Sequence, residues 1–372
     1  MAGDNPLYTY LTSHPEAIFG APVEATTFDP ANPYVLAPHL CAAAAELPLG
    51  GRDLPAFGAT ASELLDELVR RGLLRRRADG WYWNYARPED PSRLTDLRGG
   101  GTEATMQIVE AGTGRLLGTV DAARADATVH PGAVYVHQGR TYVVETLADD
   151  VALVHEETVL AYRTRAQSST RVTVLATRDE RDWGDVRWGL GTVELTSRVT
   201  AFQRLRVPSL ETLGTFPLDR PERRLRTTAV WWTVTPAALA EAGIGTAELP
   251  GALHAAEHAS IGLLPLVATC DRWDIGGLST ALHEQTLLPT VFVYDGLPGG
   301  SGFAERGYAA AVGWLTATRD LVAACGCRDG CPGCVQSPKC GNNNSPLDKA
   351  AARRLLDLVL SREPAAQHVP VA

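Results

Sequence analysis

The sequence is poor in lysine, in long apolar runs and in net positive charge. Its 372 residues include only two lysines, Lys339 and Lys349, against 32 arginines, an imbalance that a high-GC codon bias explains. No stretch approaches eighteen uninterrupted apolar residues, which excludes a transmembrane helix. The formal net charge of −9 argues against a protein that coats nucleic acid over its whole surface. Any nucleic-acid contact is therefore expected to be local.

The first residues also lack the features of a secretory signal. Met1 to Pro6 contain neither a basic stretch nor an apolar core, so we expect a cytoplasmic protein whose thiols stay reduced. With 45% hydrophobic and 21% charged residues, the chain has the composition of a globular protein. Its length suffices for two or three domains with a sizeable core.

Five of the seven cysteines fall within sixteen residues near the C-terminal end. The spacing Cys-x-Cys-x3-Cys-x2-Cys supplies four thiolates from one short loop that has too few apolar residues to hold itself together. Glycines and Pro332 favour the tight turns of a zinc knuckle. The predicted ligands of a structural Zn²⁺ ion are Cys325, Cys327, Cys331 and Cys334. Cys340 is an alternative ligand or a neighbour of the site.

Two other interpretations of the cysteine cluster are weaker. Disulfides need an oxidising compartment, for which the sequence gives no sign. A redox pair formed by Cys331 and Cys334 leaves Cys325 and Cys327 unexplained, and it lacks the usual strand-then-helix placement. The zinc knuckle is therefore preferred.

Composition and periodicity divide the chain into four expected parts. We expect an extended lead-in over residues 1–35, a winged-helix domain over 36–95, a β-rich small barrel or sandwich over 96–235, and an α/β zinc-binding domain over 236–372. The last two parts are also compatible with one unit. The predicted fold class is mixed α+β.

The winged helix is predicted from two helices that are followed by a hairpin. The helices are expected at 39–47 and 60–71, and the hairpin turns at Asp79-Gly80. Basic and aromatic side chains in this part suit phosphates and bases, but acidic residues interleave with them, so docking to another protein is the alternative. The candidate DNA contacts are Arg70, Arg71, Arg75, Arg76 and Arg77, with Trp81 or Trp83 against a base or sugar.

The β-rich part holds the strongest local excess of positive charge. Residues 160–230 contain thirteen arginines against eight acids. Strands are predicted on both sides of Gln138-Gly139 and over 171–177, 191–196 and 227–234. Basic, hydroxyl-rich loops beside these strands suit a phosphate backbone, although a solvated charged surface explains them equally well. The candidate DNA contacts here are Arg163, Arg165, Arg171, Arg223, Arg224, Arg226 and Trp231.

The C-terminal part alternates predicted helices and strands. Helices are expected at 251–264, 303–324 and 348–360, with strands at 267–275 and 290–294. The glycine-rich loop from Asp295 to Phe303 joins a strand to a helix, as a phosphate-cradling loop does. It matches neither the Walker pattern nor Gly-x-Gly-x2-Gly, so a tight turn without a ligand is the preferred interpretation.

A second metal motif lies on the first of these helices. His254 and His258 are four residues apart with Glu257 between them, as in inverted zincin peptidases. A catalytic zinc there would need Glu284 or Glu305 as its third ligand, with Glu257 as general base. The preferred interpretation is that these side chains pack the helix, through hydrogen bonds, against the zinc knuckle or the turn at 271–274.

Several segments together resemble a known family. They are His254-Ala-Ala-Glu257-His258, Cys270-Asp-Arg-Trp-Asp274-Ile-Gly-Gly, Tyr294-Asp-Gly-Leu-Pro-Gly-Gly-Ser-Gly-Phe303 and Gly330-Cys-Pro-Gly-Cys-Val-Gln-Ser-Pro-Lys-Cys340-Gly-Asn-Asn-Asn-Ser-Pro-Leu-Asp-Lys349. They resemble the zinc-binding domain at the end of MrfA-type superfamily-two DNA helicases, which are related to the fungal Hrq-type helicases. Upstream, stretches at 6–10, 14–16 and 32–40 are similar to the segment between the motor and the winged helix, so the resemblance covers nearly the whole chain.

The resemblance implies the C-terminal module of an ATP-driven 3'-to-5' DNA helicase that repairs mitomycin-type crosslinks or adducts. It implies single-stranded or forked DNA and helicase motor lobes, in cis or in trans, as partners, and hence a nucleoid-associated location. No Walker lysine loop, Asp-Glu-x-His box or arginine-finger motif occurs, so ATP and Mg²⁺ would bind only in motor lobes outside this sequence. Because residue 1 falls within family-like sequence, we expect a fragment of a longer helicase rather than a stand-alone subunit. A zinc hydrolase and a docking subunit without DNA affinity are the alternatives.

Overall fold

The computed structural model describes residues 3, 5–20, 22, 26–97, 105–148 and 150–364. Parts of the expected lead-in and the start of the expected β-rich part lie outside the described residues. The last eight residues of the zinc-binding part do so too. Among the described residues, no helix is both long and apolar enough to cross a membrane.

The N-terminal segment contains two short helices before residue 20, so the expectation of a wholly extended lead-in was wrong. Helix α1 (Pro6–Ser13) begins after Asn5, whose side chain accepts a hydrogen bond from the Tyr8 amide at 2.9 Å. A short helix α2 (Glu16–Phe19) follows. Pro6 packs so closely on Gly262 that a side chain at that glycine would meet the proline ring at 2.6 Å. The segment is thus part of the C-terminal core.

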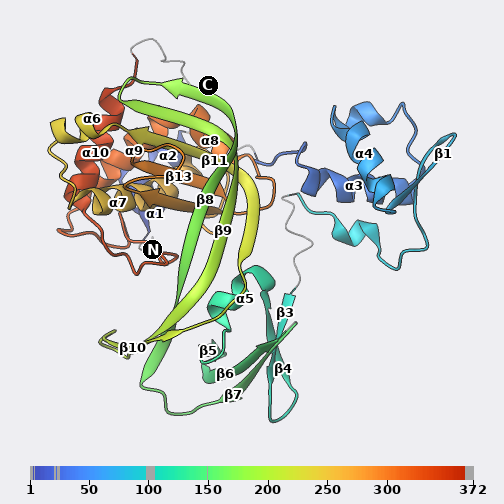
Figure 1. Cartoon of the computed structure of the whole chain (residues 1–372), viewed down its shortest axis with the longest axis horizontal. Helices are drawn as coiled ribbons and strands as arrows, with labels where there is room; N and C mark the ends of the chain where they lie inside the picture. The colour runs from blue at the N-terminus through green and yellow to red at the C-terminus, as the bar shows by residue number, and fades with distance from the viewer. Residues whose placement is uncertain are drawn as a thin grey trace.

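The winged helix forms as its pattern predicts and lies to one side of the molecule (Figure 1). Its elements are α3 (Pro33–Glu46), a 3-10 helix (Leu54–Phe57), α4 (Ala61–Arg70), β1 (Leu74–Arg77), β2 (Gly80–Trp83) and a second 3-10 helix (Pro91–Leu94). Leu40, Leu65 and Leu74 are buried in its core. Trp81 and Trp83 are only 7% and 4% exposed, because they fill this core from β2. Neither ring offers the base-stacking surface that the sequence suggested.

A small five-stranded sheet follows the winged helix. Its elements are β3 (Thr105–Glu110), β4 (Leu116–Asp121), α5 (Ala122–Thr128), β5 (Val134–His137), β6 (Arg140–Ala148) and β7 (Val151–Glu156), with strand order β4-β3-β7-β6-β5. The predicted turn between β5 and β6 is confirmed. Gln138 and Gly139 both have positive φ, 48° and 78°, as a two-residue hairpin requires.

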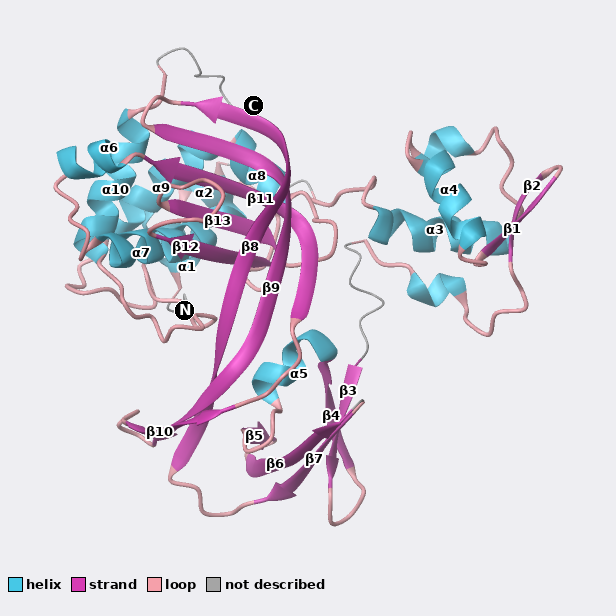
Figure 2. Ribbon diagram, viewed as in Figure 1, coloured by secondary structure: helices cyan, strands magenta, loops and turns pink. Residues whose placement is uncertain are grey.

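The main sheet contains strands from both sides of residue 235. Its elements are β8 (Tyr162–Asp182), β9 (Val186–Arg206), β10 (Thr212–Pro217), β11 (Arg223–Val234), β12 (Ile275–Thr280) and β13 (Thr290–Asp295). The order is β10-β9-β11-β13-β12, and β8 pairs with β9. The structure therefore joins the β-rich and zinc-binding parts in one unit. Figure 2 shows the long β8–β9 ribbon running from this sheet to the small sheet. The strand expected at 267–275 was wrong, since β12 begins only at Ile275.

Helices cover one face of the main sheet. They are α6 (Pro236–Glu241), α7 (Leu249–Leu263) with a 3-10 turn (Leu264–Leu266), α8 (Phe303–Ala309), α9 (Ala311–Ala324) and α10 (Lys349–Ser361). The expected single helix at 303–324 is interrupted at Ala310. Trp188, Trp232 and Trp314 lie in the core between these helices and the sheet. α7 runs through the middle of this layer and is buried along almost its whole length.

The opposite face of the main sheet curls into a half barrel, which confirms the mixed fold class and its barrel element. Trp231 and Phe292 pack inside it, with ring centroids 5.8 Å apart. β12 is the last strand in the sheet order, and the loop between β12 and β13 connects this edge of the sheet to β8. Gln285 accepts a hydrogen bond from the Val174 amide at 2.7 Å and donates to the Val174 carbonyl at 2.9 Å. The side-chain amide of Gln285 thus makes the two backbone hydrogen bonds at Val174 that a neighbouring strand would otherwise make.

Candidate metal centre and nucleic-acid interface

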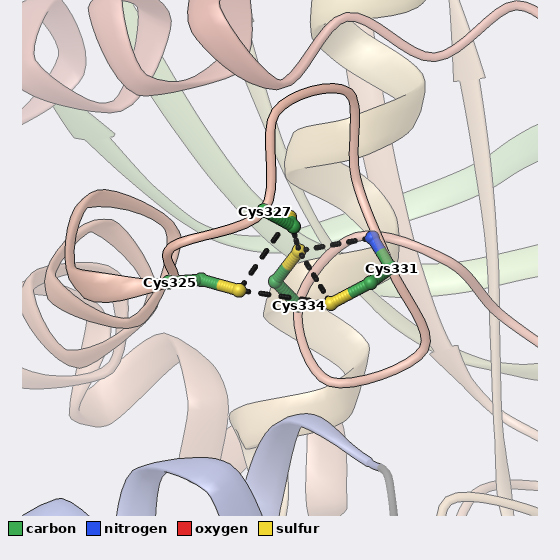
Figure 3. A group of neighbouring side chains, drawn as sticks. All are labelled: Cys325, Cys327, Cys331 and Cys334. Atoms are coloured by element: carbon green, nitrogen blue, oxygen red, sulfur yellow. Dashed lines mark hydrogen bonds between the residues drawn. The ribbon is translucent and has the colours of Figure 1, made fainter.

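The side chains of Cys325, Cys327, Cys331 and Cys334 converge on one point (Figure 3). Four Sγ–Sγ distances between them are 3.5, 3.6, 3.5 and 3.7 Å. A tetrahedron of thiolates about 2.3 Å from a zinc ion has edges of about 3.8 Å. The donor set, the soft ligand atoms and the spacing therefore fit Zn²⁺.

Local backbone geometry explains why these four side chains meet. Cys325 ends α9, and its amide donates to the Leu321 carbonyl at 3.1 Å. A tight turn between the last two cysteines follows, in which the Cys334 amide donates to the Cys331 carbonyl at 3.0 Å. The Cys331 amide in turn donates to Cys334 Sγ at 3.3 Å. Gly330, with φ of 107°, allows the chain to reverse.

Lys349, the first residue of α10, fastens this loop to the helix. Its ammonium group donates to the carbonyls of Cys325 at 2.5 Å and Cys327 at 2.7 Å, and it lies 3.3 Å from Cys327 Sγ. Burial opposes ionisation of Cys327. Hydrogen bonds from Cys325, Cys334 and Lys349 outweigh that effect and lower the pKa of the Cys327 thiol to about 7. One of the two lysines in the chain therefore supports the thiolate form.

Replacing Lys349 with methionine should weaken zinc binding by about 10–100-fold, the usual cost of losing a group that supports a metal ligand. The methionine side chain preserves the apolar packing of the lysine stem, but it donates no hydrogen bond to Cys327 Sγ. A chromogenic chelator competing for zinc would measure the change. Lys349→Arg retains the positive charge and should lose less. Equal zinc affinity in the methionine variant and the unaltered chain would contradict this role.

Cys340 does not join the four cysteines. Its thiol instead lies beside His254 and His258, so Glu284 and Glu305 are not third ligands of the histidine pair. Glu305 pairs with Arg178 at 2.7 Å. The expected packing role of the pair against the zinc knuckle is confirmed for His258, whose Nδ1 lies 2.9 Å from the Val335 carbonyl.

The Glu257 side chain extends toward β12 of the main sheet. A side chain at Gly277 of β12 would meet Glu257 Oε1 at 2.6 Å. Burial raises the pKa of Glu257 to about 7, while Ser279 and His254 act in the opposite direction. Because the carboxyl faces β12, the arrangement that an inverted zincin needs for its general base is not present.

The glycine-rich loop after β13 is closed by a carboxylate of the chain itself. The buried Asp295 accepts hydrogen bonds from the amides of Ser301 at 2.5 Å, Phe303 at 3.2 Å and Ala304 at 2.8 Å. Burial raises the pKa of Asp295 to about 7 and nearby Glu305 adds to the rise, whereas these amides oppose it. The amides at the start of α8 are thus already used, which confirms the tight-turn interpretation over a phosphate site.

Asn32 docks on the same loop and leads into the winged helix. Its side-chain amide donates to the carbonyls of Pro298 at 2.8 Å and Gly300 at 2.6 Å. Gly299 must be a glycine, since its φ is 77° and a Cβ there would lie 2.3 Å from Asn32 Oδ1.

Removing both donors in Asn32→Ala should cost about 1–3 kcal/mol of unfolding free energy, which urea denaturation would measure. An unchanged midpoint would contradict this anchoring role.

The arginines of the winged helix are mostly engaged with its own acids. Arg70 and Arg71 both pair with Glu67, at 2.5 and 2.6 Å. Arg76 lies 3.4 Å from Asp66, and its guanidinium stacks over the Trp81 ring. Among the described residues, Arg75 has no recorded acidic partner and is exposed. This surface therefore offers less free positive charge than the sequence suggested.

The arginines of the β-rich part differ in their surroundings. Arg223 pairs with the buried Asp126 of α5 at 2.8 Å, and Arg165 donates to Asn343 at 2.5 Å. Arg163 is exposed. Trp231 is 6% exposed inside the half barrel, so the expectation that it contacts DNA was wrong. The sequence could not show that both faces of β11 are covered.

Three exposed arginines share one face of the main sheet. Thr196 of β9 lies between two of them, opposite Arg171 of β8 on one side and Arg224 of β11 on the other. Two residues further along β11, Arg226 lies opposite Glu194 of β9. Directly paired residues point to the same side of a sheet. Arg171 and Arg226 pair with no carboxylate recorded within the described part of the chain, while Arg224 lies 3.2 Å from Glu222. We call Arg171, Arg224 and Arg226 the arginine row.

Two regions of the chain match domains of known protein families. Residues 256–335 match the family described as the MrfA Zn-binding domain. Residues 28–100 match the winged-helix domain of the ATP-dependent helicase HRQ1. The chain thus contains two regions that are similar to domains of the MrfA and HRQ1 helicases. The two matched regions include the knuckle, most of α7 and the whole winged helix.

Relatives and a solved structure extend the similarity over nearly the whole chain. The uncharacterized ATP-dependent helicase YprA of Bacillus subtilis is 29% identical over 90% of this chain and 44% of its own length. The helicase HRQ1 of Saccharomyces cerevisiae is 25% identical over 97% of this chain and 35% of its own length. A crystal structure of the helicase MrfA bound to DNA covers 95% of this chain and 46% of that one, at 28% identity and a TM-score of 0.58. The chain thus spans less than half the length of these relatives.

Proposed function

We propose that this chain is the zinc-stabilised, DNA-gripping C-terminal module of an ATP-dependent 3'-to-5' DNA helicase that acts in repair of mitomycin-type crosslinks or adducts. The two matched domains and the similarity to helicases over nearly the whole chain support the helicase context. The four-cysteine cluster supports the zinc, and the arginine row supports the contact with DNA. ATP and Mg²⁺ would bind in motor lobes that act in cis or in trans.

The zinc ion would be held by Cys325, Cys327, Cys331 and Cys334. When bound, it cross-links four points of a loop that has few apolar side chains besides its cysteines. The protein supplies the remaining support. Cys325 ends α9 and Lys349 begins α10, so a fixed loop keeps these two helices, which pack on each other and on α7, in register. Metal is therefore a structural element here, not a reactant.

The observation that carries the DNA proposal is the arginine row, whose side chains are exposed on a stretch of the same sheet face that the helices cover further along at Val230 and Trp232. Phosphate contacts need exposed guanidinium groups that are not already neutralised, and Arg171 and Arg226 meet that condition within the described residues. The similar MrfA structure is bound to DNA, which supports the same partner for this chain. Single-stranded or forked DNA is the proposed form, since motor lobes would deliver separated strands.

Fluorescence anisotropy of labelled single-stranded and forked DNA, repeated from low to moderate salt, tests this function. We expect binding that weakens as salt rises, with a slope of log affinity against log salt of about −0.7 per phosphate contact on single strands. Absence of binding at low salt would overturn the proposal. It would instead favour a zinc-stabilised docking subunit whose motor partner holds the DNA.

A further inference from the structure

A second group of metal-ligating side chains lies outside the four-cysteine cluster. His254 and His258 are one turn apart on α7, and their rings stand edge to face with centroids 4.2 Å apart. Cys340 reaches them from the loop that follows the knuckle. Its Sγ lies 3.3 Å from His254 Nε2, and the three ligand atoms all lie within 4.8 Å of one another. Residues 86 positions apart in sequence therefore share one site.

Both imidazole rings are held in the orientation that a metal ligand needs. His254 Nδ1 lies 2.8 Å from the Pro346 carbonyl, and His258 Nδ1 lies 2.9 Å from the Val335 carbonyl. A carbonyl oxygen only accepts hydrogen bonds, so Nδ1 of each ring is the donor and Nε2 is the nitrogen that remains to bind a metal. Metal-bound histidines typically make this backbone contact with the nitrogen that is not ligating.

The loop around Cys340 is built to support a negatively charged sulfur. The Asn344 amide donates to Cys340 Sγ at 3.2 Å. The Asn344 side chain accepts from the Ser337 amide at 2.7 Å and donates to the Ser337 carbonyl at 3.1 Å, which closes the loop around the sulfur. Asn344 itself has a φ of 57°, a conformation that asparagine tolerates better than most residues.

Hydrogen bonding alone leaves this group incomplete. A thiol has one proton and can donate to only one of the two Nε2 lone pairs at a time. A cation between the three side chains would satisfy both imidazoles and the sulfur together. For sulfur and nitrogen ligands about 2.3 and 2.05 Å from a tetrahedral zinc ion, the S–N edge is about 3.5 Å, close to the distance between Cys340 and His254.

We propose that His254, His258 and Cys340 bind a second divalent cation of the zinc class. Two imidazoles and one thiolate form a borderline-soft ligand set that suits zinc and not magnesium or calcium. Within the described part of the chain, this group includes no fourth His, Cys, Asp or Glu, so one coordination position is left for water. Because Glu257 faces β12, the ion acts as a clamp between α7 and the loop at 335–346.

The clamp would fix a contact with the β8–β9 ribbon. Asn343, three residues after Cys340, accepts a hydrogen bond from Arg165 of β8 at 2.5 Å and donates to Gln203 of β9 at 2.8 Å. The same short loop therefore carries one metal ligand and one ribbon contact. Binding of the ion ties the ribbon that bears Arg171 to the central helix of the zinc-binding part.

Zinc content of the purified full chain, measured by inductively coupled plasma mass spectrometry after extensive desalting, tests this site. The expected result is two zinc equivalents for the unaltered chain and one for Cys340→Ala. Cys340→Asp, which keeps a ligand atom, should retain more zinc than the alanine variant. Cys41→Ala, in the winged-helix core, is the matched control and should keep both equivalents. One equivalent in the unaltered chain, or two in Cys340→Ala, would overturn the proposal.

Cobalt substitution during expression provides a second test that needs no variant. Co²⁺ held by four thiolates and Co²⁺ held by one thiolate and two imidazoles give different visible spectra, so two sites produce a superposition. The superposition is the expected result for the unaltered chain. A spectrum of four-thiolate cobalt alone would overturn the proposal even if Cys340→Ala proved unstable. Neither readout depends on DNA binding, so the outcome is independent of the proposed function.

Discussion

Cys331→Ser should remove the zinc of the four-cysteine cluster and unfold the part of the chain around it. A serine hydroxyl is a poor zinc ligand, and the loop from Cys325 to Cys334 has few apolar side chains besides its cysteines. Structural zinc contributes an apparent binding free energy on the order of 10 kcal/mol in small zinc domains, comparable to the whole stability of a typical domain. We therefore expect loss of one zinc equivalent together with aggregation or a large fall in Tm.

Metal analysis and thermal unfolding of the same sample would check this result. The matched control is Cys41→Ser, because Cys41 is buried in the winged-helix core and takes no part in either metal group. That variant should keep all of its zinc even if it lowers the stability of the winged helix. Full zinc retention in Cys331→Ser would show that the ligand assignment is wrong.

Asp295→Ala should cost about 3–5 kcal/mol of unfolding free energy. The carboxylate is fully buried and holds the amides of Ser301, Phe303 and Ala304, so its removal leaves three donors without a partner near the start of α8. The same loop carries Asn32 and thereby the link to the winged helix. Loss of Asp295 is thus expected to loosen the loop and that link together.

Urea denaturation at pH 8, where the Asp295 carboxyl is ionised, would measure this loss. Asp295→Asn keeps one carbonyl oxygen as an acceptor and should cost less than the alanine variant. Asp219→Ala is a surface control, since Asp219 is 93% exposed and pairs only with Arg198 among the described residues. It should change the unfolding free energy by less than about 0.5 kcal/mol. Equal effects of Asp295→Ala and Asp219→Ala would contradict the buried role of Asp295.

Local signals predicted the elements whose geometry is set within a few residues. The hairpin turn at Gln138-Gly139 follows from the positive φ that both residues adopt. The convergence of the four cysteines follows from their spacing in one short loop. α10 begins after Asp348, whose carboxylate accepts from the Ala351 amide at 2.8 Å, as an N-cap aspartate does.

Features that depend on contacts between residues far apart in the chain were not predicted from the sequence. Cys340 meets His254 only because the loop after the knuckle folds back on α7, and no local pattern contains that information. Lys349 could have been noticed, since it is one of two lysines, but its contact with Cys327 depends on the packing of α10 against α9. α1 was missed because it is short and gains its stability from packing on α7.

The pairing of the arginines with acidic side chains also depends on contacts between distant residues. No local pattern distinguishes Arg70, which pairs with Glu67, from Arg171, which pairs with no acid among the described residues. Trp231 and Trp232 are adjacent and point to opposite faces of β11, so one face would ordinarily be exposed. Both are buried because the sheet curls over Trp231 while the helices cover Trp232.

The salt dependence of DNA binding by a variant of the arginine row tests the central claim most directly. The variant carries Arg171→Gln, Arg224→Gln and Arg226→Gln, and its control carries Arg187→Gln, Arg328→Gln and Arg353→Gln at three exposed positions away from the row. On single-stranded DNA, loss of the two phosphate contacts expected of Arg171 and Arg226 should reduce the magnitude of the slope of log affinity against log salt by about 1.4, and Arg224, which is paired with Glu222, should add less. The control should bind with the slope of the unaltered chain. An unchanged affinity and slope in the arginine-row variant would contradict a DNA-gripping role for this face of the sheet.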